Sequence, residues 1–278
     1  MKVIEVNGEP LACAERGSGS PVLFIHGTGS NSGTFEPVLD HLPGTVRAIT
    51  YDRRGYGSSV GPPARRLGEH ARDAAALLEV LAARPATVVG SSSGGVLALR
   101  LAAARPDLVS ALVLIEPVYQ AALIPSPSTA AAVGRVMLRW ALRRDPKGAA
   151  LRYYRWATSY AGGSNQFDTY PEEWQRAALS DARTALREVV QAMVPGPGPS
   201  AVRRIARPTT VLIGDAGLPV FHEASRRALR AIPQAREVTV PGAAHFVHSD
   251  EPAVCAAAIV DAVDMSERLW SAPNRSRS

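Results

Sequence analysis

A serine stands in a short run of small residues between a strand pattern and a helix pattern. Residues 88–96 read Val-Val-Gly-Ser-Ser-Ser-Gly-Gly-Val, so that Gly90, Ser92 and Gly94 form the spacing G-x-S-x-G. A sharp strand-to-helix turn exposes the central serine at the helix N-terminus, where free backbone N–H groups favour negative charge. The small neighbours allow the backbone to pass close to adjacent elements. The pattern therefore predicts a nucleophile elbow with Ser92 as the nucleophile.

A serine hydroxyl needs a base to accept its proton, and histidine has the ordinary pKa closest to neutrality. Among six histidines, His245 follows the last predicted strand, in Val-Pro-Gly-Ala-Ala-His-Phe at residues 240–246. His245 is therefore the predicted base, and His248, three residues later, is the alternative.

A second run of small residues follows a predicted buried strand, in Phe-Ile-His-Gly-Thr-Gly-Ser at residues 24–30. The backbone of such a loop can approach a ligand and donate an N–H to a developing oxyanion. We expect Thr28 to supply one donor of an oxyanion hole, and Ser93, next after the nucleophile, to supply the other. His26 is interpreted as a residue that holds the loop.

Hydrophobic patterning predicts the elements that position these groups. Strand patterns alternate with helix patterns, which predicts a mostly parallel sheet of eight strands flanked by helices, an α/β fold. The strands are expected at residues 3–6, 11–15, 22–25, 46–51, 87–89, 111–115, 209–213 and 237–240, and the helices at 66–83, 94–104, 221–231 and 252–265.

One long segment carries no strand pattern. Residues 119–205 contain helix patterns at 129–144, 148–159 and 171–194, bounded by proline-rich breaks. We therefore predict a core domain of residues 1–118 and 206–265, a helical insertion at 119–205, and a disordered tail at 266–278.

Together these motifs resemble the α/β-hydrolase fold superfamily, from about Val3 to Val263. Residues 52–59, Asp-Arg-Arg-Gly-Tyr-Gly-Ser-Ser, resemble the family's D-x-R-G-x-G-x-S loop, in which Asp52 and Arg54 are usually structural. The resemblance implies a lid-bearing, esterase-like serine hydrolase with a Ser-acid-His catalytic triad. It places the lid between the sixth and seventh strands and implies no cofactor.

The acid departs from the family's pattern. Family members usually carry it as G-x-x-D after the seventh strand, but here that position is Gly217, which cannot ionise. Asp215 lies two residues earlier. Glu116 ends the preceding strand, and some family branches place the acid there. We hypothesise that Glu116 is the triad acid, with Asp215 as the alternative.

The resemblance also narrows the reaction. Epoxide hydrolases and dehalogenases of this fold use an aspartate where Ser92 stands. The expected function is hydrolysis of a carboxylic ester, or of a lactone or thioester, of a small apolar or aromatic metabolite through an acyl-enzyme. The alternative is a non-hydrolytic role in metabolite biosynthesis, as a lyase or cyclase, or in ligand binding.

Residues 120–205 hold eight of the 16 aromatic residues of the chain: Trp140, Tyr153, Tyr154, Trp156, Tyr160, Phe167, Tyr170 and Trp174. They either pack the insertion's own core or line a pocket for a bulky acyl group. The pocket candidates are Gly29, Trp140, Tyr154, Trp156 and Phe246.

The insertion also holds the excess charge. The formal net charge is +6, and residues 120–205 contain 12 cations against six acids. These arginines either form a solvated outer face or attract anionic substrates to the mouth of a pocket. No nucleic-acid recognition motif accompanies them, so the expected partner is a small-molecule substrate and not nucleic acid.

The composition excludes several other classes. With 46% hydrophobic and 20% charged residues, the chain is neither disordered nor a coiled coil. Cys13 and Cys255 lack metal-site spacing, so no metal is expected. Two isolated cysteines are instead consistent with a reducing compartment, and we expect a cytoplasmic location. No apolar run approaches the roughly 20 residues that span a bilayer, so no membrane partner is expected. The sequence does not indicate an oligomeric state.

Overall fold

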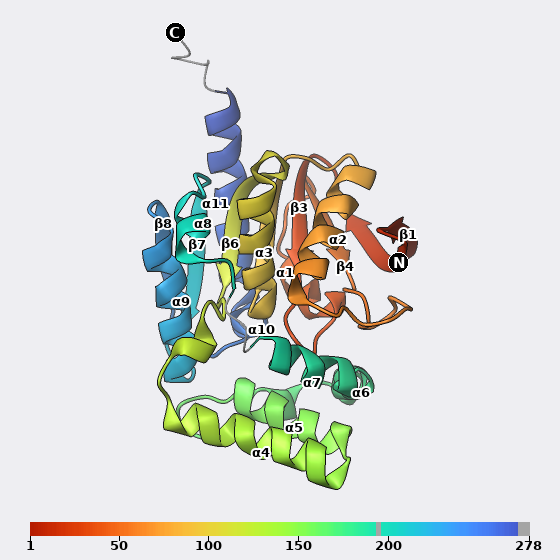
Figure 1. Ribbon diagram of the computed structural model, residues 1–278. Coiled ribbons are helices and arrows are strands. Elements are labelled where there is room, and N and C mark those ends of the chain that lie inside the picture. Colours follow the sequence, from red (N-terminus) through yellow and green to blue (C-terminus); the bar gives the residue numbers. More distant parts are fainter. Residues whose placement is uncertain (193–195, 272–278) are drawn as a thin grey trace.

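The computed structural model describes residues 1–192 and 196–271, and its described strands form one sheet of eight in the order β1-β2-β4-β3-β5-β6-β7-β8 (Figure 1). Strands β1 and β2 pair antiparallel, as do β2 and β4, and the remaining pairs are parallel. The predicted α/β fold class is confirmed. The strands are β1 (Lys2–Val6), β2 (Glu9–Arg16), β3 (Ser20–Ile25), β4 (Val46–Tyr51), β5 (Ala86–Ser91), β6 (Val109–Ile115), β7 (Thr209–Gly214) and β8 (Ala235–Val240).

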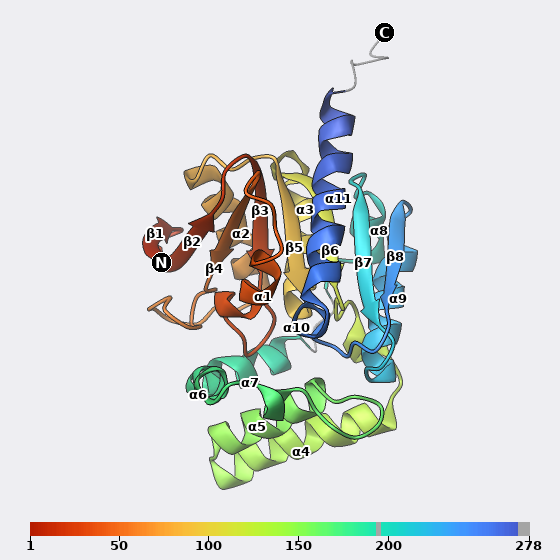
Figure 2. The ribbon, with the colours of Figure 1, turned by 180° about the vertical axis from the view of Figure 1, so that it is seen from behind.

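The central strands are apolar along their whole length because both faces of the sheet are covered. Every residue of β5, β6 and β7 is buried. One face packs against α2 (Leu67–Val80), α3 (Ser93–Ala104), α8 (Pro199–Arg203) and α9 (Pro219–Ala231). The other packs against α1 (Glu36–Leu39) and α11 (Pro252–Ser271), as Figure 2 shows. The sheet is therefore a rigid platform between two hydrophobic layers.

The C-terminal helix is longer than the sequence patterning predicts. Helix α11 continues to Ser271, so the prediction of a disordered tail is wrong for residues 266–271. The run meets no glycine or proline before Pro273, and its residues therefore continue the helix. Ser266 is buried and its hydroxyl donates to the Val263 carbonyl at 2.8 Å. Residues 272–278 of the predicted tail lie outside the described residues.

Four longer helices occupy the chain between β6 and β7, and they lie beyond the carboxyl ends of the parallel strands (Figures 1 and 2). They are α4 (Pro127–Arg143), α5 (Pro146–Ala157), α6 (Glu172–Ser180) and α7 (Ala182–Gln191). The single helix predicted over residues 171–194 is wrong, because α6 and α7 are separated at Asp181. The Asp181 side chain instead accepts a hydrogen bond from the Gly57 N–H at 2.8 Å. Residues 193 and 194 of that prediction are not among those described.

Candidate active site

The turn between β5 and α3 holds Ser92 in a backbone conformation that few non-glycine residues adopt. Its φ is 55° and its ψ is −119°. The conformation requires small neighbours: a Cβ on Gly94 would overlap the Ile25 carbonyl, and one on Gly90 would overlap the Gly94 carbonyl. The strained turn presents the Ser92 hydroxyl at the carboxyl edge of the sheet.

The Ser92 hydroxyl contacts the predicted base. His245 Nε2 lies 2.9 Å from Ser92 Oγ, and His245 Nδ1 lies 3.2 Å from Glu116 Oε2. With its proton on Nδ1, the ring donates to Glu116 and accepts from Ser92. Phe221 stacks on the ring with centroids 3.8 Å apart, which fixes its plane.

Glu116 follows β6 directly and turns its side chain along the sheet edge. Its φ is 45°, in the left-handed region. The carboxyl is fully buried, and the Gly214 N–H donates to its second oxygen at 3.1 Å. Ser92 and Glu116 are also tied through the backbone, since the Ser92 N–H donates to the Ile115 carbonyl at 2.9 Å.

Burial shifts the pKa values of both His245 and Glu116. Burial lowers the pKa of His245 to about 3, so the imidazole is neutral at neutral pH and can accept a proton. Burial raises the pKa of Glu116 above its usual range, although His222 and the Gly214 N–H act in the opposite direction because they favour the carboxylate. The two groups are in contact and buried, so they titrate as one unit.

Two residues weighed as alternatives lie elsewhere. Asp215 is exposed and accepts a hydrogen bond from the Gly242 N–H at 2.7 Å, which makes it a turn residue. His248 lies between Thr34 Oγ1, at 2.9 Å from its Nε2, and Ser91 Oγ, at 3.4 Å from its Nδ1. Neither contacts the Ser92–His245 pair. Gly217, where the family usually carries the acid, lies beside His245: a Cβ there would be 3.4 Å from the His245 backbone nitrogen.

The predicted oxyanion donors lie on two neighbouring segments. Thr28 follows β3 and Ser93 begins α3, and their hydroxyl oxygens are 3.0 Å apart. His26 supports this loop, since its Nε2 accepts from the Arg53 N–H at 3.0 Å. Among the described residues, the backbone N–H groups of Thr28 and Ser93 have no hydrogen-bond acceptor.

A buried glutamate that the sequence analysis missed holds both of these segments. Glu188 reaches down from α7, and its Oε1 accepts from the Thr28 and Ser93 hydroxyls at 2.8 Å each. The Arg53 guanidinium donates to both of its oxygens at 3.0–3.1 Å, and the Tyr56 hydroxyl donates at 2.6 Å. Burial is the largest single influence and raises the pKa of Glu188, but the Arg53 charge, His70 and the hydrogen bonds from Tyr56 and Arg53 together outweigh it and lower the pKa to about 2.

Glu188 and Arg53 therefore form an ion pair in the interior of the protein. Their side chains are 3% and 0% exposed. The sequence signal for Glu188 is a carboxylate three residues after the buried Ala185, and so on the inward side of α7. The position of Glu188 in the sequence indicates a buried ion pair only when a buried cation is known to face that side of α7.

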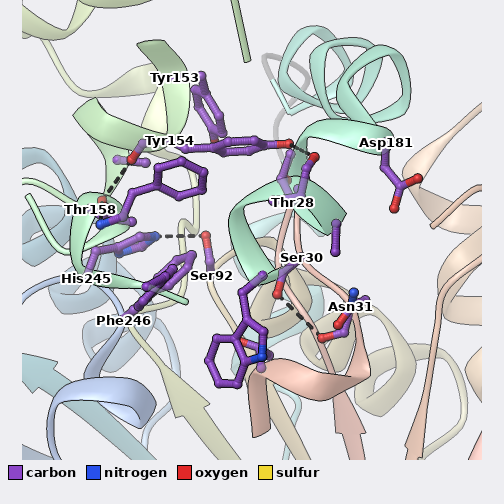
Figure 3. Close-up of a pocket in the computed structure, with 18 of the residues that line it drawn as sticks. Thr28, Ser30, Asn31, Ser92, Tyr153, Tyr154, Thr158, Asp181, His245 and Phe246 are labelled. Atoms are coloured by element: carbon purple, nitrogen blue, oxygen red, sulfur yellow. Dashed lines mark hydrogen bonds between the residues drawn. The ribbon is translucent and has the colours of Figure 1, made fainter. Parts of the chain in front are cut away.

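Two cavities meet at the nucleophile. The small cavity, of about 90 Å³, is lined by Ser92, His245 and the candidates Gly29, Tyr154 and Phe246 (Figure 3). The large cavity, of about 670 Å³, is lined by Ser92, Ser93, Phe221 and the candidate Trp156. Thr28 and Tyr153 line both, so the site opens on two sides of one hydroxyl.

One pocket prediction is wrong. Trp140 lines neither cavity and packs instead against Val136, Ala149 and Leu186 in the core of the insertion. Trp140 therefore lies on the side of α4 that packs in the insertion's core. Some aromatic residues of the insertion thus pack its own core, and others line the cavities at Ser92.

The basic residues of the insertion lie away from Ser92. Neither cavity is lined by arginine or lysine in the part of the chain that the structure describes. A surface depression over α4 and α5 instead gathers Arg135, Arg139, Arg152 and Arg155. Within residues 1–192 and 196–271, no cluster of side chains suits a metal ion, and no helix is both long and apolar enough to cross a membrane.

Comparisons with known proteins agree with this architecture. The sequence pattern described as the alpha/beta hydrolase family matches residues 22–258. The 2-(acetamidomethylene)succinate hydrolase of Mesorhizobium japonicum is 29% identical over 270 residues, which are 94% of each chain.

Two solved structures share the fold. An esterase from Thermogutta terrifontis has a TM-score of 0.78 at 22% identity, over 96% of this chain and 99% of its own. A bromoperoxidase from Bacillus anthracis has a TM-score of 0.79 at 21% identity, over 95% and 99%.

Proposed function

The chain belongs to the alpha/beta hydrolase family, and from this premise we propose that it is a serine hydrolase that cleaves a carboxylic ester. The observation that carries the proposal is the continuous contact from Ser92 Oγ to His245 Nε2 at 2.9 Å and from His245 Nδ1 to Glu116 at 3.2 Å. The strained elbow at Ser92 supports it, because strain of this kind persists where a side chain must be presented in a fixed direction.

The proposed reaction begins with acylation. Ser92 Oγ forms a bond to the acyl carbon, and its proton moves to His245 Nε2. The carbonyl oxygen becomes an oxyanion that accepts from the Thr28 and Ser93 N–H groups. Glu116 keeps the ring oriented and stabilises the imidazolium. The C–O bond to the leaving alcohol then breaks, and His245 gives the alcohol its proton.

Deacylation repeats these steps with water. His245 takes a proton from the water, whose oxygen bonds to the acyl carbon of the acyl-enzyme. The bond to Ser92 Oγ then breaks, the serine recovers its proton, and the carboxylic acid leaves. Every proton is carried by a group in contact, so the reaction needs no cofactor.

The lining of the cavities supports an apolar or aromatic substrate. The Mesorhizobium relative is named for a substituted succinate, a compound with two carboxylates. The described walls of the cavities at Ser92 carry no arginine or lysine to pair with such anions. We therefore place this chain's substrate among neutral acyl compounds, as esters, with lactones and thioesters as further candidates.

A fluorophosphonate probe tests the proposal, because it labels only an activated serine. The expected result is labelling of the wild type and of Ser91→Ala, a matched control one residue from the nucleophile, and no labelling of Ser92→Ala. Wild-type protein that stays unlabelled would refute the hydrolase function and favour a non-hydrolytic lyase, cyclase or binding role.

A further inference from the structure

The two cavities lie on chemically different sides of Ser92. His245 lines the small cavity and does not line the large one, which reaches the nucleophile past Ser93 and Phe221. A leaving alcohol must receive its proton from His245 Nε2 as it departs. The leaving group therefore belongs on the side that His245 lines, and the acyl group on the other.

The two cavities also differ in size, and the cavity on the acyl side is the larger. The small cavity measures about 90 Å³. The large cavity, at about 670 Å³, falls in the range of pockets that enclose a whole small molecule. The large cavity therefore offers more room for a bulky group.

The cavities also differ in chemistry. The described wall of the large cavity has no charged side chain and includes Val133, Met137, Trp156 and Phe221. The small cavity combines aromatic side chains with the polar side chains of Ser30, Asn31, Thr34 and Asp181, the last of them a carboxyl group. Transfer of an apolar group from water to the wall of the large cavity is favourable, whereas a hydroxyl-bearing group finds hydrogen-bond partners in the small cavity.

We propose that the large cavity binds the acyl group and the small cavity binds the leaving alcohol, so that the substrates are esters of a bulky apolar carboxylic acid with a small polar alcohol. This assignment rests on the proposed function, because it uses Ser92 as nucleophile and His245 as proton donor. Tyr153 lines both cavities and stands at their junction.

Two isomeric esters test the assignment. Methyl nonanoate places the long chain on the acyl side, and octyl acetate places it on the alcohol side, at equal overall apolar surface. The expected kcat/KM is higher for methyl nonanoate. Across methyl esters of lengthening acids, kcat/KM should rise about fourfold per methylene until the cavity is full. Across acetates of lengthening alcohols it should stay flat or fall.

A cavity-filling variant locates the effect. On α4, Ala130, Val133, Gly134 and Met137 line the large cavity, whereas Ala131 is exposed on another side of the same helix. Val133→Trp should lower kcat/KM for methyl nonanoate at least tenfold more than it lowers kcat/KM for methyl acetate. The matched control Ala131→Trp should change neither.

The results separate this inference from the function beneath it. Faster cleavage of octyl acetate than of methyl nonanoate, with Ser92 labelled by fluorophosphonate, would overturn the assignment and leave the hydrolase function standing. A Val133→Trp variant that slows octyl acetate but spares methyl nonanoate would do the same. No cleavage of any of these esters, with Ser92 unlabelled, would overturn both.

Discussion

Replacing Glu188 with methionine, which has no oxygen to accept hydrogen bonds, is expected to lower kcat by about 10²- to 10³-fold and to leave KM nearly unchanged. In the wild type, one carboxylate oxygen accepts from both the Thr28 and Ser93 hydroxyls, and thereby holds the two segments whose N–H groups would receive the oxyanion. Losing one such donor costs about 2.7–4 kcal/mol of transition-state stabilisation. The oxyanion forms only in the transition state, so the loss falls on kcat.

The same substitution removes a charge from the protein interior. Arg53 is fully buried, and its guanidinium would lose the partner that balances it. Breaking a buried ion pair costs about 3–5 kcal/mol of stability, so the melting temperature should fall as well. Rates are therefore expressed per active site, counted by fluorophosphonate titration of the folded enzyme. Glu172→Met is the control, because this residue pairs with Arg176 on the exposed surface of α6.

A double variant separates catalysis from stability. Replacing both Arg53 and Glu188 with methionine removes both charges, which should recover much of the lost stability. The Thr28 and Ser93 hydroxyls would still lack their acceptor, so kcat should stay low. The reasoning is refuted if Glu188→Met keeps its kcat per active site within about twofold of wild type, or if the double variant recovers kcat together with stability.

Three further outcomes are expected. Glu116→Gln should lower kcat about 10⁴-fold, as loss of the group that orients the base does, whereas Asp215→Asn should have little effect. In a Glu116→Ala background, Gly217→Asp should restore part of the rate because it places a carboxylate beside His245. No recovery of the rate would contradict that geometry. Burial lowers the pKa of His70 from 6.5 to about 3, so the unfolded chain binds more protons than the folded protein between these pH values. The contribution of His70 to stability is therefore complete above pH 6.5 and is lost as the pH drops toward 3, by up to about 1.4 kcal/mol per pH unit. Urea unfolding of His70→Gln should show a flatter dependence of stability on pH. Raising the salt concentration should affect kcat/KM equally for neutral methyl esters and for anionic methyl hydrogen succinate; a selective loss for the anion would instead assign the surface arginines a steering role.

Local patterns in the sequence predict the sheet and the position of the nucleophile because both depend on neighbouring residues. A run such as β5 is apolar along its length, and the glycines around Ser92 report a tight turn directly. The contact between Glu116 and His245 spans 129 residues, yet it could be anticipated because parallel strands bring their carboxyl ends to one edge. The catalytic roles of these residues stay predictions until the variants are measured.

The features that the sequence analysis missed depend on how distant helices pack. Glu188 and Arg53 are 135 residues apart, and no spacing rule relates a helix of the insertion to a loop of the sheet. Trp140 was expected in a pocket on the basis of residue type, but the rotation of α4 about its axis decides which neighbour it meets. At the break between α6 and α7, Asp181 accepts a hydrogen bond from Gly57, which lies 124 residues away in the chain.

The buried ion pair sets a condition on protein engineering and on evolution. Arg53 belongs to a loop of the sheet domain and Glu188 to the helical insertion, so each part carries one half of the pair. A chimaera that received the insertion of a homologue without an acid at this position would enclose an uncompensated guanidinium. Insertions can therefore be exchanged between such enzymes only together with the matching loop residue, and the two positions should change in concert during divergence.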